Sequence, residues 1–498
     1  MSAGELHRMA MTVLQTGFPG TAPPPWLRRA LDDGLGGVLL FARNIAGPEQ
    51  TAGLVAGLRA ANPELIVAID EEGGAVTRLE AATGSSWPGN LALGVVDDPA
   101  LTERVAREIG RMVAAAGITL DYAPVADVNT DPDNPVIGVR SFGSDPELVA
   151  RHAAAFVRGV QDAGVAACAK HFPGHGDTVT DSHLALPTVR APLPVLRRRE
   201  LPPFRAAIRA GVRAIMCGHL LVPGIDTVPA TLSRRVITDL LRGELGFGGL
   251  VVTDAIEMRA VAERYGPGEI AVRALAAGAD LICLGLAGHG ADLYALRDAI
   301  VAAVRDGRLP EERLAEAAGR VRGLAAWCAA QAPRRRAAAG EVDHGLGLAA
   351  ATAALRASGA PDRPVLRSAP LVIEMAAEQT RAVGRPTPLG LGRALAEILP
   401  GTERAEVTEG DPLPALPRTR PVVLTVRDAH RHPWMRRLLA EAVRERPDAV
   451  VVETGVPGPP IGALYLATHG DSTASARAAA RWLTAPAEAR VAGSSDRP

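Results

Sequence analysis

The sequence has no excess of either charge. It contains 54 Lys and Arg residues against 55 Asp and Glu residues, so the formal net charge is −1. A protein that binds nucleic acid usually carries a basic patch or stripe, and none is visible along this chain. A nucleic-acid partner is therefore not expected.

Long apolar segments are also missing. No stretch of about 18 apolar residues runs free of charged or turn-forming residues, so no membrane-spanning helix is expected. Residues 1–20 lack the apolar segment behind a basic start that marks a secretory signal peptide. Both absences favour a soluble, cytoplasmic protein with no membrane partner.

Cysteine is scarce. The four in the chain stand singly, at Cys168, Cys217, Cys283 and Cys328. Three of these positions lie in apolar runs of the sequence. We interpret the cysteines as small core residues rather than as a disulfide framework.

The chain does contain enough apolar residues for a large core. Its 498 residues are 47% hydrophobic, which allows one large domain and a smaller second one. Short apolar runs alternate with amphipathic segments through the first part of the chain, as in a parallel sheet covered by helices on both faces. These runs predict eight strands, at 11–18, 36–41, 65–70, 118–128, 165–172, 214–219, 249–256 and 280–285. Eight such units predict an α/β fold of the (β/α)8 TIM-barrel type.

Polar residues stand at the ends of five of these eight strands. They are Asp70, Asp127, Lys170 with His171, His219 and Asp254. Barrel enzymes place their chemistry at the carboxyl ends of the strands. Capping and turn formation would account for one or two of these residues, so the whole set predicts an active site at this face.

The sequence after residue 330 predicts a second domain. Four further apolar runs alternate with helical segments there, at 371–375, 421–428, 448–455 and 462–470. This pattern is typical of a small α/β domain built in layers.

The segment between the two patterns sets the expected boundaries. Residues 345–359 have a helical pattern that ends at Gly359, and Pro361 and Pro364 interrupt regular structure after it. We expect a catalytic barrel at 1–335, a linker with a helix at 336–364, and the small α/β domain at 365–498.

The segment KHFPGHGDTVTDSHLALP, residues 170–187, concentrates polar and titratable side chains. Pro173 and Gly174 prevent a helix and favour a tight loop. Asp181 and His183 stand two residues apart, so the carboxylate can bond one ring nitrogen and raise the basicity of the other. The pair is a candidate acid/base dyad. The alternative is a loop held together only by its own polar groups.

A metal site is another interpretation of the same segment. His171 and His175 have the spacing of a helical zinc motif, and His183 could join them. Pro173 and Gly174 lie between the first two histidines and rule out that helix. We therefore predict no metal here.

Three further residues are candidates for the site. Asp254 follows an apolar strand, where a carboxylate is costly unless it is used or paired, so it is a candidate nucleophile; otherwise it caps the next helix. Asp70 precedes glycines that let a backbone approach a ligand closely. Arg140 lies in a loop with small neighbours and suits a polar or anionic ligand, or else it is a surface arginine.

Five segments together resemble a known family. AIDEEGG, DYAPVADVN, IGVRSFGSDP, AKHFPGHGDTVTDSH and VVTDAIEM occur in this order. They are similar to the motifs of glycoside hydrolase family 3, in its bacterial β-N-acetylglucosaminidase (β-hexosaminidase) branch and two-domain form. The resemblance covers roughly residues 10–330. The long KHFPGHG…DSH segment makes it specific, because such a segment is hard to meet by chance.

The resemblance implies a role for each matching residue. Asp254 is implied to be the catalytic nucleophile, and Asp181 with His183 the dyad in which His183 is the general acid/base. The residues implied to hold and position the sugar are Asp70, Arg140, Lys170 and His171, with His219 lining the pocket. No metal or organic cofactor is implied.

The chain departs from the family pattern in two places. Thr253 stands where some relatives have serine before the nucleophile, a small change since both are hydroxyl residues. The chain also continues well past the point where one-domain relatives stop, and the resemblance to two-domain relatives implies a smaller αβα sandwich-like domain there. Some two-domain relatives take their acid/base from the second domain, but the DSH motif on the first domain argues against that arrangement here.

The expected activity is retaining cleavage of a terminal, non-reducing β-linked N-acetylglucosamine, with cell-wall fragments or chito-oligosaccharides as carbohydrate substrates. Three alternatives stay open at this point. The first is a β-N-acetylglucosaminide phosphorylase, which would use phosphate as the acceptor. The others are a metal-dependent barrel hydrolase and a sugar-binding protein without catalysis.

Overall fold

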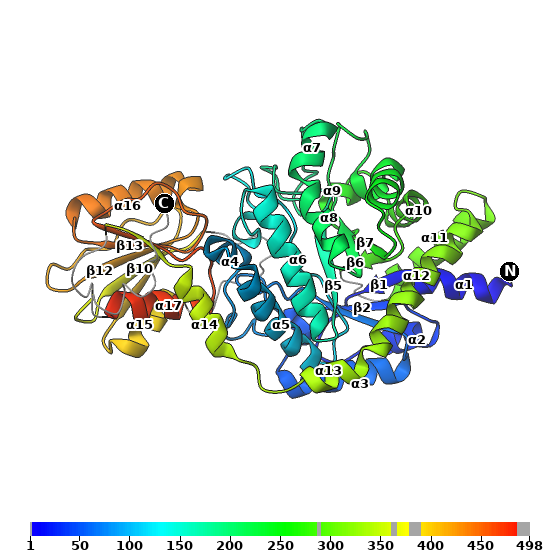
Figure 1. The fold of residues 1–498 in the computed structure, drawn as a ribbon, viewed down its shortest axis with the longest axis horizontal. Coiled ribbons are helices and arrows are strands. Elements are labelled where there is room, and N and C mark those ends of the chain that lie inside the picture. Colours follow the sequence, from blue (N-terminus) through cyan, green and yellow to red (C-terminus); the bar gives the residue numbers. More distant parts are fainter. Residues whose placement is uncertain (1, 286–289, 360–365, 378–389, 486–498) are drawn as a thin grey trace. The chain divides into compact units, whose positions relative to one another are not determined.

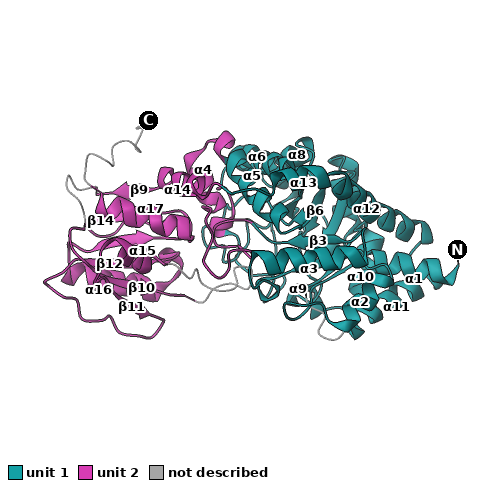
Figure 2. Ribbon diagram, turned by 90° about the horizontal axis from the view of Figure 1, so that it is seen from below, with its two compact units in different colours: residues 1–71, 102–137, 144–342 teal, residues 72–101, 138–143, 343–498 magenta. Residues whose placement is uncertain are grey.

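The computed structural model describes residues 2–285, 290–359, 366–377 and 390–485 (Figure 1). The chain divides into two compact units, drawn in teal and magenta in Figure 2. Unit 1 comprises residues 1–71, 102–137 and 144–342, and unit 2 comprises residues 72–101, 138–143 and 343–498. Two loops from the first third of the chain thus belong to the same compact unit as its last third.

Unit 1 is built around a parallel barrel of eight strands. They are β1 (Leu14–Thr16), β2 (Gly37–Leu40), β3 (Ile66–Ile69), β4 (Leu120–Asp121), β5 (Ala166–Phe172), β6 (Ala214–Cys217), β7 (Leu250–Thr253) and β8 (Ile282–Leu284). The pairing order is β7-β6-β5-β4-β3-β2-β1-β8, and a parallel bridge between Val252 and Leu281 joins the two ends. The barrel and all eight predicted strands are therefore confirmed.

Two of the predicted strands are much shorter than expected. The run 11–18 loses its first residues to helix α1 (Ala3–Thr12), which leaves Leu14–Thr16 as the strand. The run 118–128 keeps only Leu120–Asp121 as regular strand, because Pro124 has no N–H to donate to a ladder. An isolated bridge between Val125 and Lys170 continues the contact with β5.

Helices surround the barrel (Figure 1). The helices of unit 1 after α1 are α2 (Pro25–Asp32), η1 (Ala42–Asn44), α3 (Pro48–Ala61), α5 (Pro99–Ala115, whose first residues belong to unit 2), α6 (Pro146–Asp162), α7 (Leu193–Arg199), α8 (Leu201–Arg209), η3 (Ala230–Leu232), the π-helix η4 (Arg235–Glu244), α9 (Arg259–Ala262), α10 (Pro267–Ala277), α11 (Ala291–Arg305), α12 (Glu311–Ala330) and α13 (Ala332–Ala338). Within the described residues, none of the chain's helices is long and apolar enough to cross a membrane.

The core of the barrel is filled by small and branched side chains from alternate positions of the strands. Val321, Leu324 and Cys328 of α12 pack into the same cluster. All four cysteines are buried and free, as predicted from their apolar surroundings.

Unit 2 contains a six-stranded sheet in the order β11-β10-β12-β13-β14-β9. The strands are β9 (Arg356–Ser358), β10 (Leu371–Met375), β11 (Glu403–Val407), β12 (Val422–Val426), β13 (Val450–Glu453) and β14 (Leu464–Ala467). All pairs are parallel except that between β14 and β9. The helices are α4 (Asn90–Val96), η2 (Gly138–Arg140), α14 (His344–Ala353), α15 (Leu391–Ile398), η5 (Ala429–Arg431), α16 (Pro433–Glu445) and α17 (Thr473–Thr484).

Helices cover both faces of this sheet. One apolar cluster joins it to α16, and another joins it to α15 and α17 (Figure 1). The predicted αβα sandwich is therefore confirmed.

The helix predicted at 345–359 is wrong at its end. The helix α14 stops at Ala353, and Arg356–Ser358 pair antiparallel with β14 as an edge strand. The Arg356 guanidinium donates to the carbonyls of Ala353 and Leu355. Pairing with a distant strand thus overrides the local helical pattern, and the residues 360–364 of the predicted linker lie outside the described residues.

Candidate active site

The strands β3 and β5 end in a buried ion pair. Lys170, in β5, is 2% exposed, and its Nζ lies 2.7 Å from Oδ1 of Asp70. Asp70 follows β3 directly, and its side chain is partly open to solvent. Since a buried ammonium needs a partner, the pair fixes both side chains at the carboxyl end of the barrel.

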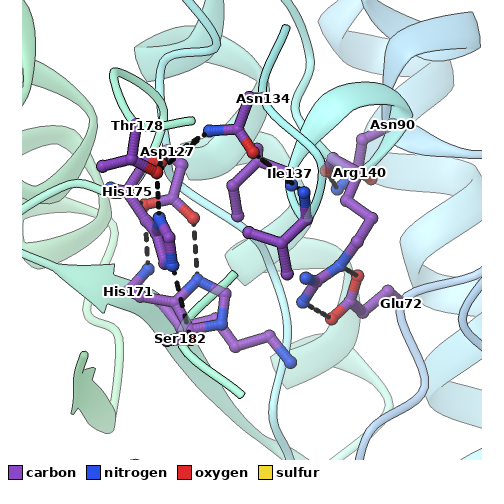
Figure 3. A network of polar contacts seen from close by, with 12 residues as sticks. Glu72, Asn90, Asp127, Asn134, Ile137, Arg140, His171, His175, Thr178 and Ser182 are labelled. Atoms are coloured by element: carbon purple, nitrogen blue, oxygen red, sulfur yellow. Dashed lines mark hydrogen bonds and ion pairs between the residues drawn. The ribbon is translucent and has the colours of Figure 1, made fainter. Parts of the chain in front are cut away.

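Asp127 organises the turn that follows β5 (Figure 3). Its Oδ2 accepts from Nδ1 of His171 at 2.8 Å, and its Oδ1 accepts from the backbone N–H groups of His171 and His175. Burial alone would raise the pKa of Asp127, but the charge and hydrogen bonds of His171 hold that pKa below its ordinary value. Because Asp127 holds Nδ1, the ring nitrogen of His171 that can contact a ligand is Nε2.

His175 connects this turn to the candidate dyad. Its Nδ1 lies 2.8 Å from the Thr178 hydroxyl, and its Nε2 lies 3.4 Å from the hydroxyl of Ser182. Asn134 also donates to the backbone carbonyl of His175 (Figure 3). Gly176 is required where it stands, because a Cβ there would lie 1.8 Å from the carbonyl oxygen of Val128.

Asp181 and His183 form the contact that the sequence predicts. Oδ1 of Asp181 accepts from both the backbone N–H and Nδ1 of His183, at 2.8 and 2.7 Å. Burial would raise the pKa of Asp181, but its hydrogen bonds with His183 hold the pKa below the ordinary value. The ionised carboxylate fixes the proton on Nδ1, so Nε2 of His183 can accept or donate a proton. The side chain of His183 is 25% exposed against 5% for Asp181, so the imidazole is the member of the pair that a ligand can reach.

Asp254 follows β7 at the same end of the barrel. Its Oδ1 accepts from the backbone N–H of Ala255 at 2.8 Å. Burial raises the pKa of Asp254, but electrostatic interactions with the imidazoles of His219, His171 and His183, together with the hydrogen bond from Ala255, outweigh it and hold that pKa below the ordinary value. Asp254 is therefore an anion with three imidazoles nearby.

His219 has both ring nitrogens occupied. Its Nδ1 lies 2.7 Å from the Thr231 hydroxyl, and its Nε2 lies 3.0 Å from the carbonyl oxygen of Ala255. Burial lowers the pKa of His219, which favours the neutral ring. A neutral ring that donates from Nε2 to a carbonyl must accept at Nδ1. His219 thus holds the backbone directly after Asp254, and this contact was not foreseen from the sequence.

Arg140 belongs to unit 2. Its Nε and Nη2 donate to the two carboxylate oxygens of Glu72, at 2.9 and 2.8 Å, and its carbonyl accepts from Asn90 at 2.7 Å (Figure 3). The guanidinium is 7% exposed, so the alternative of a surface arginine is wrong. The other seven predicted site residues all lie in unit 1.

A second ion-pair group, formed by Arg199, Glu200 and Asp177, holds the segment 170–187 that contains the dyad. Arg199 bridges Oε1 of Glu200 and Oδ2 of Asp177, each at 2.5 Å. Glu200 is fully buried, and a Cβ on Gly174 would lie 2.7 Å from its Oε2. Sequence reasoning missed this group, because the run RRRE at 197–200 has the pattern of an ordinary basic helix end.

No group of three or more His, Cys, Asp or Glu side chains in the described part of the chain is placed to hold a metal ion. Several of the possible donor atoms already bond other groups of the protein. The Nδ1 atoms of His171 and His183 bond carboxylates, and both ring nitrogens of His175 contact hydroxyls. What the arrangement offers is an ionised carboxylate, an imidazole that can transfer a proton at Nε2, and a paired lysine and aspartate.

The chain is similar to proteins of a known family. Residues 27–324 match the model of the glycosyl hydrolase family 3 N terminal domain. The beta-hexosaminidase of Pseudomonas aeruginosa is 40% identical over 258 residues, which are 50% of this chain and 75% of that protein. The Beta-hexosaminidase A of Pseudoalteromonas piscicida is 35% identical over 303 residues, and the match covers 49% of it. The chain therefore spans about half the length of that relative.

A solved structure resembles the chain over both units. The glycoside hydrolase family 3 beta-N-acetylglucosaminidase from Paenibacillus sp. str. FPU-7 is 36% identical, with a TM-score of 0.82 and 96% of each chain covered. The likeness extends past the barrel, because a match confined to residues before 330 could not reach that coverage.

Proposed function

Because the chain belongs to glycoside hydrolase family 3, we propose that it is a retaining β-N-acetylhexosaminidase that uses Asp254 and the Asp181–His183 dyad. The expected family and the expected class of enzyme, a glycosidase, are confirmed by the comparisons. The residue roles, the stereochemistry and the natural substrate are the proposal.

The first step joins the sugar to the enzyme. A carboxylate oxygen of Asp254 attacks the anomeric carbon, while the protonated Nε2 of His183 gives its proton to the leaving oxygen. The bond between the anomeric carbon and the leaving oxygen breaks, and its electron pair stays with that oxygen. This step needs an ionised nucleophile, and the depressed pKa of Asp254 supports that role.

The second step releases the sugar. Neutral His183 takes a proton from water at Nε2, and the water oxygen replaces Asp254 at the anomeric carbon. Nδ1 keeps its proton throughout, because Asp181 accepts from it in both states. An imidazole has an ordinary pKa near ~6.5, so it can act as acid and then as base near neutral pH.

Three residues are proposed to hold the sugar hydroxyls. The Lys170 ammonium and the Asp70 carboxylate meet at the strand ends with Asp70 partly exposed, so they can donate to one hydroxyl and accept from the next. Nε2 of His171 is free of the Asp127 contact. The resemblance assigns Arg140 to the same task, and this stays a prediction.

The observation that carries the proposal is the contact of Asp181 with Nδ1 of His183, which leaves Nε2 of the same imidazole for proton transfer. The test is turnover of an aryl N-acetyl-β-glucosaminide, with proton NMR of the first product formed. We expect the β-anomer to appear first, since two inversions retain configuration. Initial release of the α-anomer, or no turnover by a folded protein, would overturn the proposal.

The substrate stays open between two sources of terminal N-acetylglucosamine, namely cell-wall fragments and chito-oligosaccharides. A place in cell-wall recycling and a cytoplasmic location are predictions of the same kind. Comparing kcat/KM for a disaccharide from each source would decide between the substrates.

The same dyad favours phosphate as an alternative acceptor. A carboxylate acid/base would repel an incoming phosphate by roughly 4 kcal/mol at about 4 Å in a medium of effective dielectric ~20, whereas a neutral imidazole would not. Phosphorus NMR of a reaction run in phosphate tests this. Formation of a sugar 1-phosphate would support the phosphorylase, and an unchanged rate with only free sugar would exclude it.

A further inference from the structure

The sheet of unit 2 contains a polar row on a face that is otherwise apolar. In parallel pairing, Glu374 of β10 stands opposite Glu406 of β11 and Thr425 of β12. Residues in register on neighbouring strands point to the same face. Two residues earlier on β10 and β12, and so on the same face, Val372 and Val423 lie in the apolar cluster that packs against α15 and α17. The polar row therefore replaces the core at one end of this face.

This end of the sheet is a topological switch point. The chain runs from β10 to β11 on one side and then to β12 on the other side of β10. Open parallel sheets bind ligands in the crevice that such a reversal leaves outside the carboxyl ends of the strands. Glu374 and Thr425 are the next-to-last residues of β10 and β12, so the polar row lies at the mouth of that crevice.

A pocket of about 350 Å³ occupies the crevice. Its lining includes the polar row, the start of α15, the start of α17 and three arginines, Arg393, Arg404 and Arg427. Small-molecule sites typically begin near ~300 Å³, so the pocket has room for one or two sugar rings. The buried hydroxyl oxygen of Thr425 has no hydrogen-bond partner among the described residues. A buried hydroxyl without a partner is costly, and a ligand hydroxyl would satisfy it.

The charges of the lining favour a neutral ligand. Among the described residues of the lining, three carboxylates, of Glu374, Glu406 and Asp471, balance the three guanidinium groups. The place where a phosphate would bind, at the start of α15, is taken by Glu374, whose Oε1 accepts from the backbone N–H of Gly392 at 3.1 Å. Gly390 has no side chain at this point, and a Cβ there would lie 2.8 Å from the same carboxylate oxygen.

We propose that this pocket is a second carbohydrate site, separate from the barrel, that binds a neutral mono- or disaccharide through Glu374, Thr425 and Arg404. Carboxylates accept from sugar hydroxyls, guanidinium groups donate to them, and a threonine hydroxyl can do both. An acidic side chain at the end of a parallel strand holds ribose hydroxyls in the same manner in dinucleotide-binding sheets. The proposal does not depend on the proposed function, since it rests on the lining of unit 2 alone.

The test uses the full chain with methyl-labelled valines and N-acetylglucosamine, its β-1,4-linked dimer and glucose as the probes. Val452 is buried beside Thr425 in the same row, and a Val452→Ile variant identifies its signal. At least one of the three probes should shift the Val452 signal saturably. Absence of any shift over a concentration range well above the KM of the aryl glycoside would overturn the proposal.

Two conservative variants separate this site from the barrel. Glu374→Gln and Thr425→Val should each raise the midpoint of the Val452 shift about tenfold and leave turnover of the aryl glycoside unchanged. Asp254→Asn provides the matched control, because it should abolish turnover and leave the Val452 titration as in the wild type. The same midpoint in all four proteins would mean that Glu374 and Thr425 do not hold the sugar, and would overturn the proposal.

Discussion

The carboxyl ends of the two parallel sheets both carry polar groups, but the two sets are prepared for different tasks. At the barrel, the groups already bond one another, as in the contact of Lys170 with Asp70 and that of His183 with Asp181. At the sandwich, the Thr425 hydroxyl has no described partner. Paired groups fix protonation states and orientations in advance, which chemistry requires. Groups without partners leave hydrogen-bonding capacity for a ligand.

The largest expected effect is on the nucleophile of the barrel. Asp254→Asn should lower kcat on an aryl N-acetyl-β-glucosaminide by about 10⁴-fold or more, on the scale of removing a catalytic nucleophile. Circular dichroism should confirm an unchanged fold, since the two side chains have the same shape. Thr425→Val is the control from the sandwich and should keep full activity. Substantial retaining activity in folded Asp254→Asn would place the nucleophile elsewhere.

The next effect separates the members of the dyad. His183→Ala should lose about 10²–10⁴-fold in kcat with a poor leaving group, the usual contribution of general acid catalysis, and much less with dinitrophenol, which needs little protonation. Asp181→Asn should lose less than His183→Ala, because the imidazole remains. Parallel kinetics on both leaving groups provide the measurement. Equal losses on both would show that His183 is not the acid.

A smaller effect should come from the support under the dyad loop. Arg199→Gln removes the bridge to Asp177 and should lower kcat roughly tenfold on poor leaving groups, a modest fraction of the effect of removing the acid. With dinitrophenol the loss should be small, since this leaving group needs little protonation. Arg197→Gln, which removes an exposed pair with Glu244, is the matched control. A loss that is the same for both leaving groups would point to general destabilisation instead.

The titration of Glu200 should make the free energy of unfolding of the chain depend on pH. Burial raises the pKa of Glu200 to about 7 although Arg199 lowers it, and Asp127 and Asp177 raise it further. An unfolded glutamate titrates near ~4.3, so the folded chain binds this proton more tightly. This tighter binding of the proton stabilises the folded chain fully below pH ~4.3, and the stabilisation is lost as the pH rises to about 7.

Glu200→Gln removes this titration. The free energies of unfolding of the variant and the wild type should therefore be compared by urea unfolding at pH 5 and pH 8. From the lower to the higher pH, the free energy of unfolding of the variant should rise relative to that of the wild type by on the order of 2 kcal/mol. Glu244→Gln is the control, because Arg197 and Arg205 lower the pKa of that exposed glutamate. An unchanged difference between Glu200→Gln and wild type at the two pH values would mean that Glu200 is ionised throughout.

The smallest effect belongs to the sandwich. Thr425→Val should leave the free energy of unfolding within about 1 kcal/mol of the wild type, or raise it, because the hydroxyl that it removes has no described partner. Lys170→Met at the barrel should instead cost about 3–5 kcal/mol, since it leaves Asp70 without its charge partner. Urea unfolding of both variants measures the difference. A loss above 2 kcal/mol for Thr425→Val would mean that the hydroxyl is satisfied in solution.

The sequence predicted what depends on short apolar runs and on spacing within one segment. The eight barrel strands, four strands of the sandwich and the contact of Asp181 with His183 follow from such local patterns. The strand β11 (Glu403–Val407) was missed, because the sequence ERAEV carries charges on an exposed edge and has no apolar signal. The contacts of Asp127 with His171, of His219 with Thr231 and of Arg199 with Asp177 were missed, because in each the two residues lie 12 or more positions apart and no periodicity encodes such contacts.

The membership of residues 72–101 and 138–143 in unit 2 has a consequence for synthesis of the chain. Their partners come much later: Thr83 and Ser85 accept hydrogen bonds from Thr473 and Ala474, and Trp87, fully buried, lies beside His344. A ribosome adds about 5–20 residues per second, so this loop leaves the exit tunnel tens of seconds before the residues that bury it. Until then the indole of Trp87 lacks His344 as a neighbour. The nascent barrel carries a loop whose packing partners have not yet been synthesised. Unit 2 therefore completes its fold only after the residues that follow residue 343 have been made, although residues 72–101 of the same unit are made long before them.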